Sequence, residues 1–211
     1  MTDPITFRPI APDDIRRLHT WRNTPHVSTW WVPHHPSYET ARAEYMAYMK
    51  PEFGVDAFIW QIDGVDAGYI QKWAVRTFPD YKPHVQLTDE TVGIDVFIGE
   101  TDYLHQGWGP RVIRQFICQH IFSDATVPEC IIDPLPDNTA AIRAYEKVGF
   151  RHAKTFTHDN LAVYLMRLPR VTPLAAPLFL EAGRTPVEGQ AQERLLAEEA
   201  ARLIEASGLH Q

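Results

Sequence analysis

The sequence has little cysteine and no long apolar run. Its two cysteines, Cys118 and Cys130, cannot form a disulfide framework, and no Cys-x-x-Cys pair has zinc-site spacing. No segment approaches the roughly 18 apolar residues of a membrane-spanning helix. The N-terminus also lacks the basic start and apolar stretch of a secretory signal. We therefore expect a cytoplasmic protein with reduced cysteines and no membrane span.

Positive charge is also scarce. The 20 Lys and Arg residues are outnumbered by 27 Asp and Glu, which gives a formal net charge of -7. Nucleic-acid binding depends on clustered basic residues, so this balance argues against such a partner and favours a cationic ligand. Histidines such as His84, His105, His120 and His152 are scattered without metal-ligand spacing, and we expect no metal.

The 211 residues are 45% hydrophobic, enough for one sizeable core, and hydrophobic periodicity predicts alternating strands and helices. Predicted strands are 5–10, 56–62, 66–75, 92–98, 130–132 and 162–168. Predicted helices begin at Pro12 and span 38–49, 111–122 and 138–148. Asp63-Gly64 predicts a hairpin, so the sheet is at least partly antiparallel. Aromatic residues 27–36 and polar residues 76–91 are predicted loops.

The composition changes near residue 170. Residues 171–186 are rich in Pro and Ala, and 188–206 form an uninterrupted amphipathic pattern with one apolar stripe. We interpret 1–170 as the main domain and 171–211 as an appendage. Its helix must dock on the domain, pair with a second chain in a homodimer, or stay partly folded.

A glycine-rich turn, Gly107-Trp108-Gly109-Pro110, leads into the predicted helix 111–122. Helix N-termini with such turns bind phosphates, because the ligand approaches closely and backbone N–H groups lack internal partners. Taken alone, the two glycines are weak evidence, because a plain tight turn is the commoner explanation for them.

A second segment, Asp133 to Phe150 (DPLPDNTAAIRAYEKVGF), makes the pattern specific. Together with the turn QGWGP, it resembles the GNAT superfamily of acyl-CoA-dependent N-acyltransferases over residues 5–168. The resemblance implies an α+β fold whose mixed, mostly antiparallel central sheet is flanked by helices. It also implies that the sheet splays after Ile98 and opens a wedge for acetyl-CoA.

The resemblance further implies a set of acetyl-CoA-binding residues. These are Phe97, Ile98, Gln106, Gly107, Trp108, Gly109, Pro110, Arg111, Asn138 and Ala141. The chain departs from the family pattern at Leu104, where the family carries Arg or Gln. Gln106 or Arg111 can replace that phosphate contact.

Within the superfamily, the chain is most similar to aminoglycoside 6'-N-acetyltransferases. The shared features are the pair Trp30-Trp31, Gly93-Ile94-Asp95, the glycine turn, and Asp133-Pro134 followed by Asn138 and Tyr145. Siderophore-type lysine acyltransferases tend to carry His at the position of Asp95. Asp95 therefore favours the aminoglycoside group.

The chemistry of acetyl transfer assigns roles to two residues. An amine with a lysine-like pKa of about 10.4 must lose a proton before it attacks a thioester, and Asp95 can bind the ammonium and accept that proton. The leaving thiolate needs a proton donor, which Tyr145 can supply. The alternative for Asp95 is a structural carboxylate that accepts hydrogen bonds from backbone N–H groups or an Arg. The alternative for Tyr145 is a ring that only packs against the sheet.

A polycationic sugar needs carboxylates and aromatic walls. We expect Asp80, Glu90 and Asp133 to supply the carboxylates, and Trp30 and Trp31 to supply the walls. An acyltransferase for another amine, such as a siderophore-type lysine or a protein N-terminus, remains an alternative. So does a non-catalytic acyl-CoA-binding module.

Overall fold

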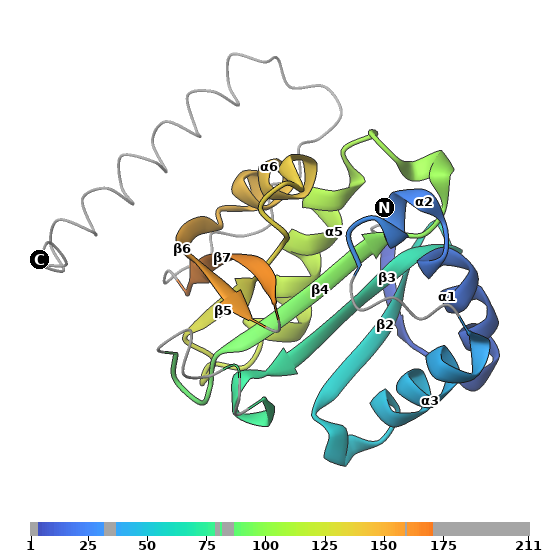
Figure 1. Ribbon diagram of the computed structural model, residues 1–211, viewed down its shortest axis with the longest axis horizontal. Coiled ribbons are helices and arrows are strands. Elements are labelled where there is room, and N and C mark those ends of the chain that lie inside the picture. The colour runs from blue at the N-terminus through green and yellow to red at the C-terminus, as the bar shows by residue number, and fades with distance from the viewer. Residues whose placement is uncertain (1–3, 32–36, 79–80, 82–86, 159, 171–211) are drawn as a thin grey trace, which may run out of the picture. The chain divides into compact units, whose positions relative to one another are not determined.

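A seven-stranded mixed sheet forms the centre of the computed structural model, which describes residues 4–31, 37–78, 81, 87–158 and 160–170 (Figure 1). The strand order is β1-β2-β3-β4-β5-β7-β6. The strands are β1 (Ile5–Pro9), β2 (Val55–Ile62), β3 (Val65–Ala74), β4 (Val92–Ile98), β5 (Glu129–Ile132), β6 (Arg151–His158) and β7 (Leu161–Pro169). The helices are α1 (Ile15–Arg22), α2 (Pro25–Ser28), α3 (Tyr38–Tyr48), α5 (Trp108–Phe116) and α6 (Thr139–Val148).

Local signals account for most of these boundaries. In the β2–β3 hairpin, Asp63 and Gly64 both have positive φ, 49° and 79°, as a two-residue hairpin turn requires. The side chain of Ser37 accepts a hydrogen bond from the backbone of Thr40 and caps α3. Gly149 ends α6 at a φ of 118°. The expected hairpin and the helices expected within the described residues are confirmed.

Three elements differ from the sequence prediction. Strand β6 was missed because its side chains are nearly all exposed, so no apolar alternation marks it. The aromatic loop contains the one-turn helix α2, which Pro25 starts. Helix α5 begins at Trp108 rather than Arg111 and continues into a π-helical turn, Ile117–Ile121.

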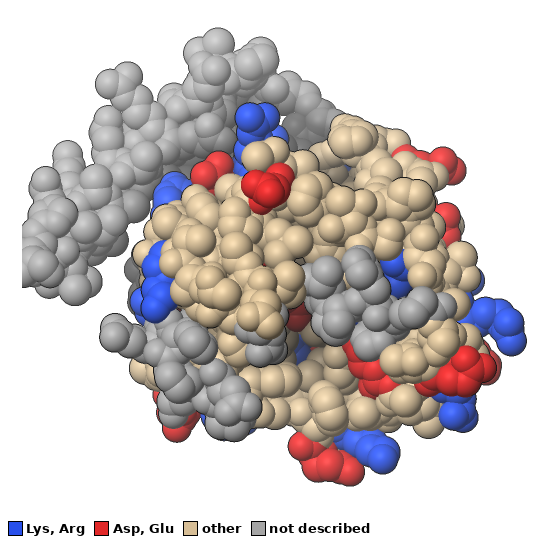
Figure 2. All heavy atoms as spheres, viewed as in Figure 1, with Lys and Arg blue, Asp and Glu red and all other residues tan. Residues whose placement is uncertain are grey.

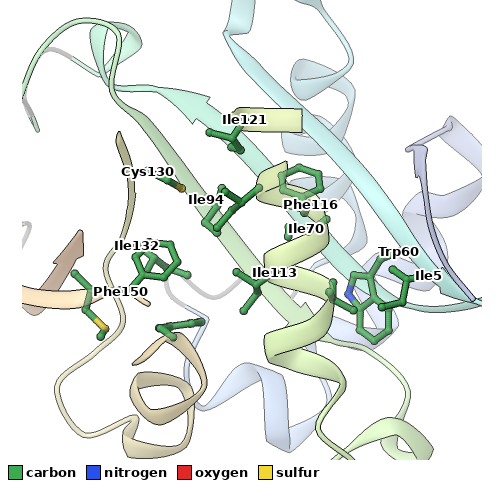
Figure 3. Close-up of a cluster of buried hydrophobic side chains, with 14 of the residues drawn as sticks. Ile5, Trp60, Ile70, Ile94, Ile113, Phe116, Ile121, Cys130, Ile132 and Phe150 are labelled. Carbon is green, nitrogen blue, oxygen red and sulfur yellow. The ribbon is translucent and has the colours of Figure 1, made fainter. Parts of the chain in front are cut away.

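The sheet separates two apolar layers, because alternate residues of a strand point to opposite faces. Helices α5 and α6 cover one face, whose packed side chains Figure 3 shows. Helices α1 and α3 cover the other face. In β4, Ile94 packs in the first layer and Phe97 in the second. Asp95 shares the side of Phe97 and so belongs to the α1/α3 face.

The neighbouring strands β4 and β5 are parallel and pair over a very short length. They are in register only at Val92–Cys130 and Gly93–Ile131, while β4 continues to Ile98. The expected opening of the sheet is present, but it begins after Gly93 instead of after Ile98. Strand β5 ends at Ile132, and Pro134 follows, which has no N–H with which to extend the ladder.

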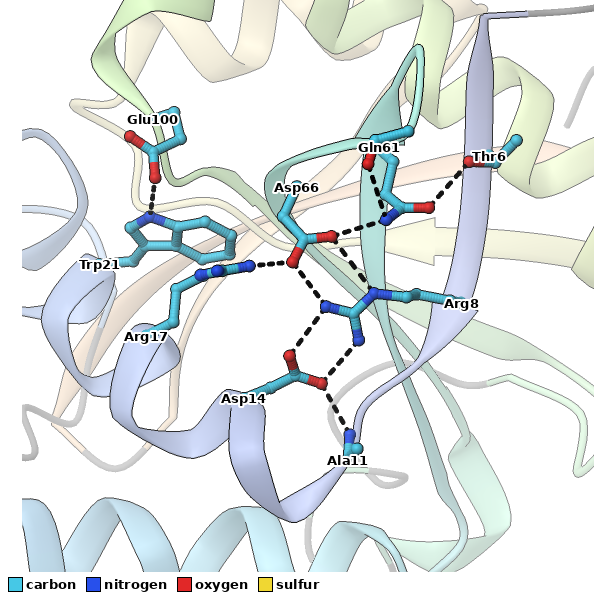
Figure 4. Close-up of polar contacts among 10 residues, drawn as sticks. Thr6, Arg8, Ala11, Asp14, Arg17, Trp21, Gln61, Asp66 and Glu100 are labelled. Atoms are coloured by element: carbon cyan, nitrogen blue, oxygen red, sulfur yellow. Dashed lines mark hydrogen bonds and ion pairs between the residues drawn. The ribbon is translucent and has the colours of Figure 1, made fainter.

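A polar network at the other edge of the sheet holds α1 against the strands (Figure 4). Arg8 on β1 donates to both oxygens of Asp14, at 2.7 and 2.8 Å, and to both oxygens of Asp66 on β3. Arg17 on α1 also pairs with Asp66. Bidentate Arg–carboxylate pairs fix orientation as well as position, so this network sets how α1 lies on the sheet.

None of the helices that the structure describes combines the length and apolar character needed to cross a membrane. The predicted appendage, 171–211, lies outside the described residues, so its helix and any dimer formed through it stay predictions.

Candidate active site

Asp95 lies at the centre of a polar cluster on the α1/α3 face. Its Oδ2 accepts hydrogen bonds from Gln71 Nε2 at 2.7 Å and from Trp73 Nε1 at 2.9 Å. Gln71 is opposite Asp95 in the β3–β4 register, and Trp73 is opposite Gly93. A Cβ on Gly93 would lie 2.3 Å from the Trp73 ring. Glycine at position 93 therefore lets the indole lie across β4 and reach the carboxylate.

A second carboxylate, Asp133, follows β5. It stands two residues beyond Ile131, just as Asp95 stands two residues beyond Gly93, the partner of Ile131. The Tyr81 hydroxyl donates to Asp133 Oδ2 at 3.0 Å. Burial raises the pKa of Asp95, although its two hydrogen bonds oppose this shift. Burial and the nearby charge of Asp95 raise the pKa of Asp133 to about 7.

Aromatic rings surround this pair of carboxylates. Trp73 packs edge-on against Tyr81, with ring centroids 5.6 Å apart. Trp31 packs against Phe97 at 4.9 Å, and Arg22 lies 5.5 Å from the Trp31 ring. Trp30 is 38% exposed and takes no part in this packing. The structure thus brings Trp31, and not Trp30, onto the same sheet face as Asp95.

Space-filling atoms show the shape of this region. In Figure 2 the surface is hollowed near the middle of the face, and atoms of both acidic and basic side chains are visible inside the hollow. Lys and Arg side chains lie mainly around the outline of the molecule in this view.

Tyr145 approaches from the opposite face of the sheet. It lies on α6, is 7% exposed, and packs its ring against Phe150. Burial, followed by the charges of Asp95 and Asp133, raises its pKa above the ordinary range, so its hydroxyl stays protonated at neutral pH. No residue in the described part of the chain hydrogen-bonds to that hydroxyl, which leaves it available to a ligand.

The glycine turn has the geometry of an anion-binding loop. Gly107 has a φ of 78° and caps α5. The N–H groups of Gly107, Trp108 and Gly109 belong to the first turn, where helical acceptors are missing. Pro110 has no N–H, so it cannot contribute a donor as the other turn residues do. A Cβ placed on Gly109 would meet no atom within 4 Å, so the space beside it is open.

The other residues expected to bind acetyl-CoA lie around this turn and α6. The Arg111 guanidinium stacks on the Trp108 ring at 4.3 Å, and the Gln106 side chain donates to the carbonyl of Asp102. The Asn138 side chain caps α6 by accepting from the backbone of Ala141 at 3.2 Å.

Two further residues of this set lie on β4. The carbonyl of Phe97 accepts from Trp60 Nε1 at 3.1 Å, and its ring is in the α1/α3 core. The carbonyl of Ile98 is 2.9 Å from His26 Nε2. Phe97 therefore has neither its side chain nor its carbonyl at the open edge of β4.

Two of the expected substrate residues gain no support from the structure. Glu90 is exposed and, in the described part of the chain, forms no hydrogen bond with Asp95 or Asp133, and Asp80 lies outside the described residues, so its role stays a prediction. Conversely, Gln71 was missed by the sequence interpretation, although a glutamine within an apolar strand signals a buried polar role. Tyr69 was missed too, because only the cross-strand register links it to Asp95 through Gln71.

Similarity to known proteins extends over most of this chain. Aminoglycoside N(6')-acetyltransferases type 1 of Klebsiella pneumoniae and of Serratia marcescens are each 28% identical over 168 residues, which cover 78% of this chain and 83% of theirs. The structure of AAC(6')-Ib in complex with paromomycin and acetyl-CoA superposes with a TM-score of 0.73 at 28% identity, covering 80% of this chain and 94% of that one. A complex of AAC(6')-Ib with coenzyme A and kanamycin gives 0.71 at 28% identity, covering 79% and 95%.

A family model described as the acetyltransferase (GNAT) domain matches residues 11–158. This range contains the opened β4–β5 pair, the glycine turn and α6. The fold expected from the sequence is confirmed, and the chain belongs to the GNAT acetyltransferase family.

Proposed function

We propose that this protein transfers the acetyl group of acetyl-CoA to the 6'-amine of aminoglycosides and so confers resistance to them. The observation that carries the proposal is the pair Asp95 and Asp133, set among aromatic rings at the opening of the sheet. A half-buried pair of carboxylates with raised pKa values is relieved by binding a cation. The relatives named as aminoglycoside N(6')-acetyltransferases support the same substrate class.

The residues around the opening fit acetyl-CoA as co-substrate. We assign the pyrophosphate to the free N–H groups of Gly107, Trp108 and Gly109, with Arg111 as the nearest exposed cation. Because backbone groups alternate along a strand and Phe97 turns its carbonyl toward Trp60, Val96 and Ile98 turn theirs to the open edge. This edge is where the pantetheine arm would add its amides. Because the carbonyl of Ile98 already contacts His26, the backbone N–H and C=O of Val96 are more available to the pantetheine arm.

The proton inventory defines the roles of Asp95 and Tyr145. Asp95 binds the substrate ammonium and accepts its proton, directly or through one water. The freed amine then forms the N–C bond to the acetyl group while the C–S bond breaks. Tyr145, which keeps its proton because of burial, donates it to the leaving thiolate. The attacking nitrogen then releases its second proton, which returns Tyr145 to the hydroxyl form, and Asp95 gives its proton to solvent. Asp133 and Trp31 hold the rest of the polycation.

The test is release of free thiol from acetyl-CoA with a panel of amines. We expect turnover of kanamycin and tobramycin and at most trace turnover of lysine-type amines or a peptide N-terminus. A higher kcat/KM for either of those would assign the protein to another amine substrate. If no amine led to thiol release, the protein would instead be a non-catalytic acyl-CoA-binding module.

A further inference from the structure

The carboxylate oxygens of Asp95 have different surroundings. Oδ2 accepts both the Gln71 amide and the Trp73 indole, whereas Oδ1 accepts no hydrogen bond from any residue that the structure describes. We propose that Gln71 is a positioning residue that keeps Oδ2 an acceptor and thereby directs the proton of the substrate amine to Oδ1. This inference rests on the proposed function of Asp95 as the proton acceptor.

The orientation of the Gln71 amide is fixed from its other end. Gln71 is 7% exposed, and its Oε1 accepts from the hydroxyl of Tyr69 at 2.5 Å. Burial raises the pKa of Tyr69 far above its usual value, so this hydroxyl is a donor at any working pH. The Tyr69 ring is stacked on Phe97 at 5.3 Å and cannot turn away. With Oε1 occupied by a donor, the amide must present its N–H group to Asp95.

Trp73 supplies the second constraint. An indole Nε1–H donates and never accepts, so the oxygen that it contacts must keep a lone pair for it in both charge states of Asp95. When the ammonium gives up its proton, Oδ2 already has two donors and cannot carry a hydrogen toward either. The proton therefore goes to Oδ1, and the Oδ2 contacts need not rearrange.

The two donors also tune when Asp95 is available as a base. Burial raises its pKa, and the bonds from Gln71 and Trp73 lower it. Removing one donor should raise the pKa further, so that a higher pH is needed to ionise Asp95. Other titratable groups electrostatically coupled to it are Asp133, Cys130 on β5, Tyr145 on α6, Tyr48 on α3, Tyr69 on β3 and Tyr81.

The experiment is a pH profile of kcat/KM for tobramycin in Gln71→Met, which keeps side-chain length and removes the donor. Because the charge of Asp95 contributes to the raised pKa of Asp133, the profile is measured both in the parent and in an Asp133→Asn background. We expect the acid limb to move up by about one pH unit, the scale of one lost hydrogen bond to a charge, with KM for acetyl-CoA unchanged. On the acid limb this corresponds to a loss of about tenfold at a fixed pH.

Two controls make the outcome decisive. Gln61→Met removes a glutamine of β2 that bonds to Thr6 and Asp66, away from Asp95, and should leave the profile unchanged. Trp73→Phe removes the other donor and should move the acid limb the same way, so it decides the matter if Gln71→Met does not fold. A rate lowered equally at every pH would overturn the proposal, because that is the effect of a merely structural residue.

The Asp95→Asn variant distinguishes failure of the positioning role of Gln71 from failure of the proposed role of Asp95 as the proton acceptor. If Asp95→Asn retained the parental rate, Asp95 would not be the proton acceptor, and the proposed function of this residue would be wrong. Loss of activity in Asp95→Asn together with unshifted profiles in Gln71→Met and Trp73→Phe would overturn the positioning role alone.

Discussion

Asp95 within β4 and Asp133 just after β5 occupy equivalent places, each two residues past the last position at which these parallel strands pair. Burial raises the pKa of both, and the charge of Asp95 contributes to the value of about 7 for Asp133. Within the described residues, neither forms a salt bridge. The protein thus keeps two like charges together without an internal counter-ion, a costly arrangement that a bound polycation relieves.

This relationship predicts how stability depends on pH. A carboxyl has a pKa of about 3.9 when unfolded, so between about pH 4 and 7 the folded chain binds more protons at Asp133, and stability falls as pH rises. Asp133→Asn removes this loss and can still accept from Tyr81. We expect it to match the parent near pH 4 and to be more stable by about 1–3 kcal/mol at pH 8. Urea unfolding at both pH values measures this, with exposed Asp137→Asn as control. An equal difference at both pH values would contradict it.

Loss of the proton acceptor should affect the reaction and spare the co-substrate. Asp95→Asn keeps the size and can still accept from Trp73, but it cannot take a proton. We expect kcat/KM for tobramycin to fall by about 100-fold or more, the usual scale for a positioned base. Calorimetry should give a Kd for acetyl-CoA within about twofold of the parent, since that site is on other residues. A near-parental rate would exclude the assigned role.

Loss of the proton donor should appear in kcat rather than in amine affinity. Tyr145→Phe keeps the ring that packs against Phe150 and removes only the hydroxyl. We expect kcat to fall by about 10- to 100-fold with KM for tobramycin within about twofold, because the hydroxyl acts on the leaving thiolate. Tyr164→Phe on β7 is the matched control. An unchanged kcat would reduce Tyr145 to a packing role.

The two glycines of the turn should respond differently to substitution. Gly107 needs its positive φ, so Gly107→Ala should cost about 1 kcal/mol of folding stability. Gly109 lies in α5 with open space at its Cβ, so Gly109→Val should fold normally. If the pyrophosphate lies against Gly109, the valine should nevertheless weaken acetyl-CoA binding by about tenfold or more. Calorimetry and thermal unfolding measure the two effects, and parental affinity in Gly109→Val would refute the loop assignment.

The sequence predicted what short-range rules determine. The Asp63-Gly64 turn, the cap at Ser37 and the stop at Gly149 each act within a few residues, and their elements are confirmed. Strand β6 has no such signal, because an exposed edge strand needs no apolar alternation. Its place is fixed by pairing with β7, which only the folded chain reveals.

The individual residues of the site were easier to predict from the sequence than the contacts between them. Asp95, Asp133 and Tyr145 were found from a motif, and the structure places all three around the sheet opening. The contacts of Asp95 with Gln71 and Trp73 depend on the β3–β4 register, and the separation of Trp31 from Trp30 depends on the packing of Phe97. The sequence interpretation misplaced the point at which the sheet opens, because this point depends on how far the short strand β5 pairs with β4.

The most direct test of the central claim is acetylation of neomycin and paromomycin, which differ only in bearing an amine or a hydroxyl at position 6'. With the purified protein and acetyl-CoA, we predict turnover of neomycin, a single acetyl group mapped to its 6'-nitrogen by NMR, and no acetylation of paromomycin. Equal turnover of the two, or an acetyl group on any other nitrogen of neomycin, would contradict the assignment of this protein as an aminoglycoside 6'-N-acetyltransferase.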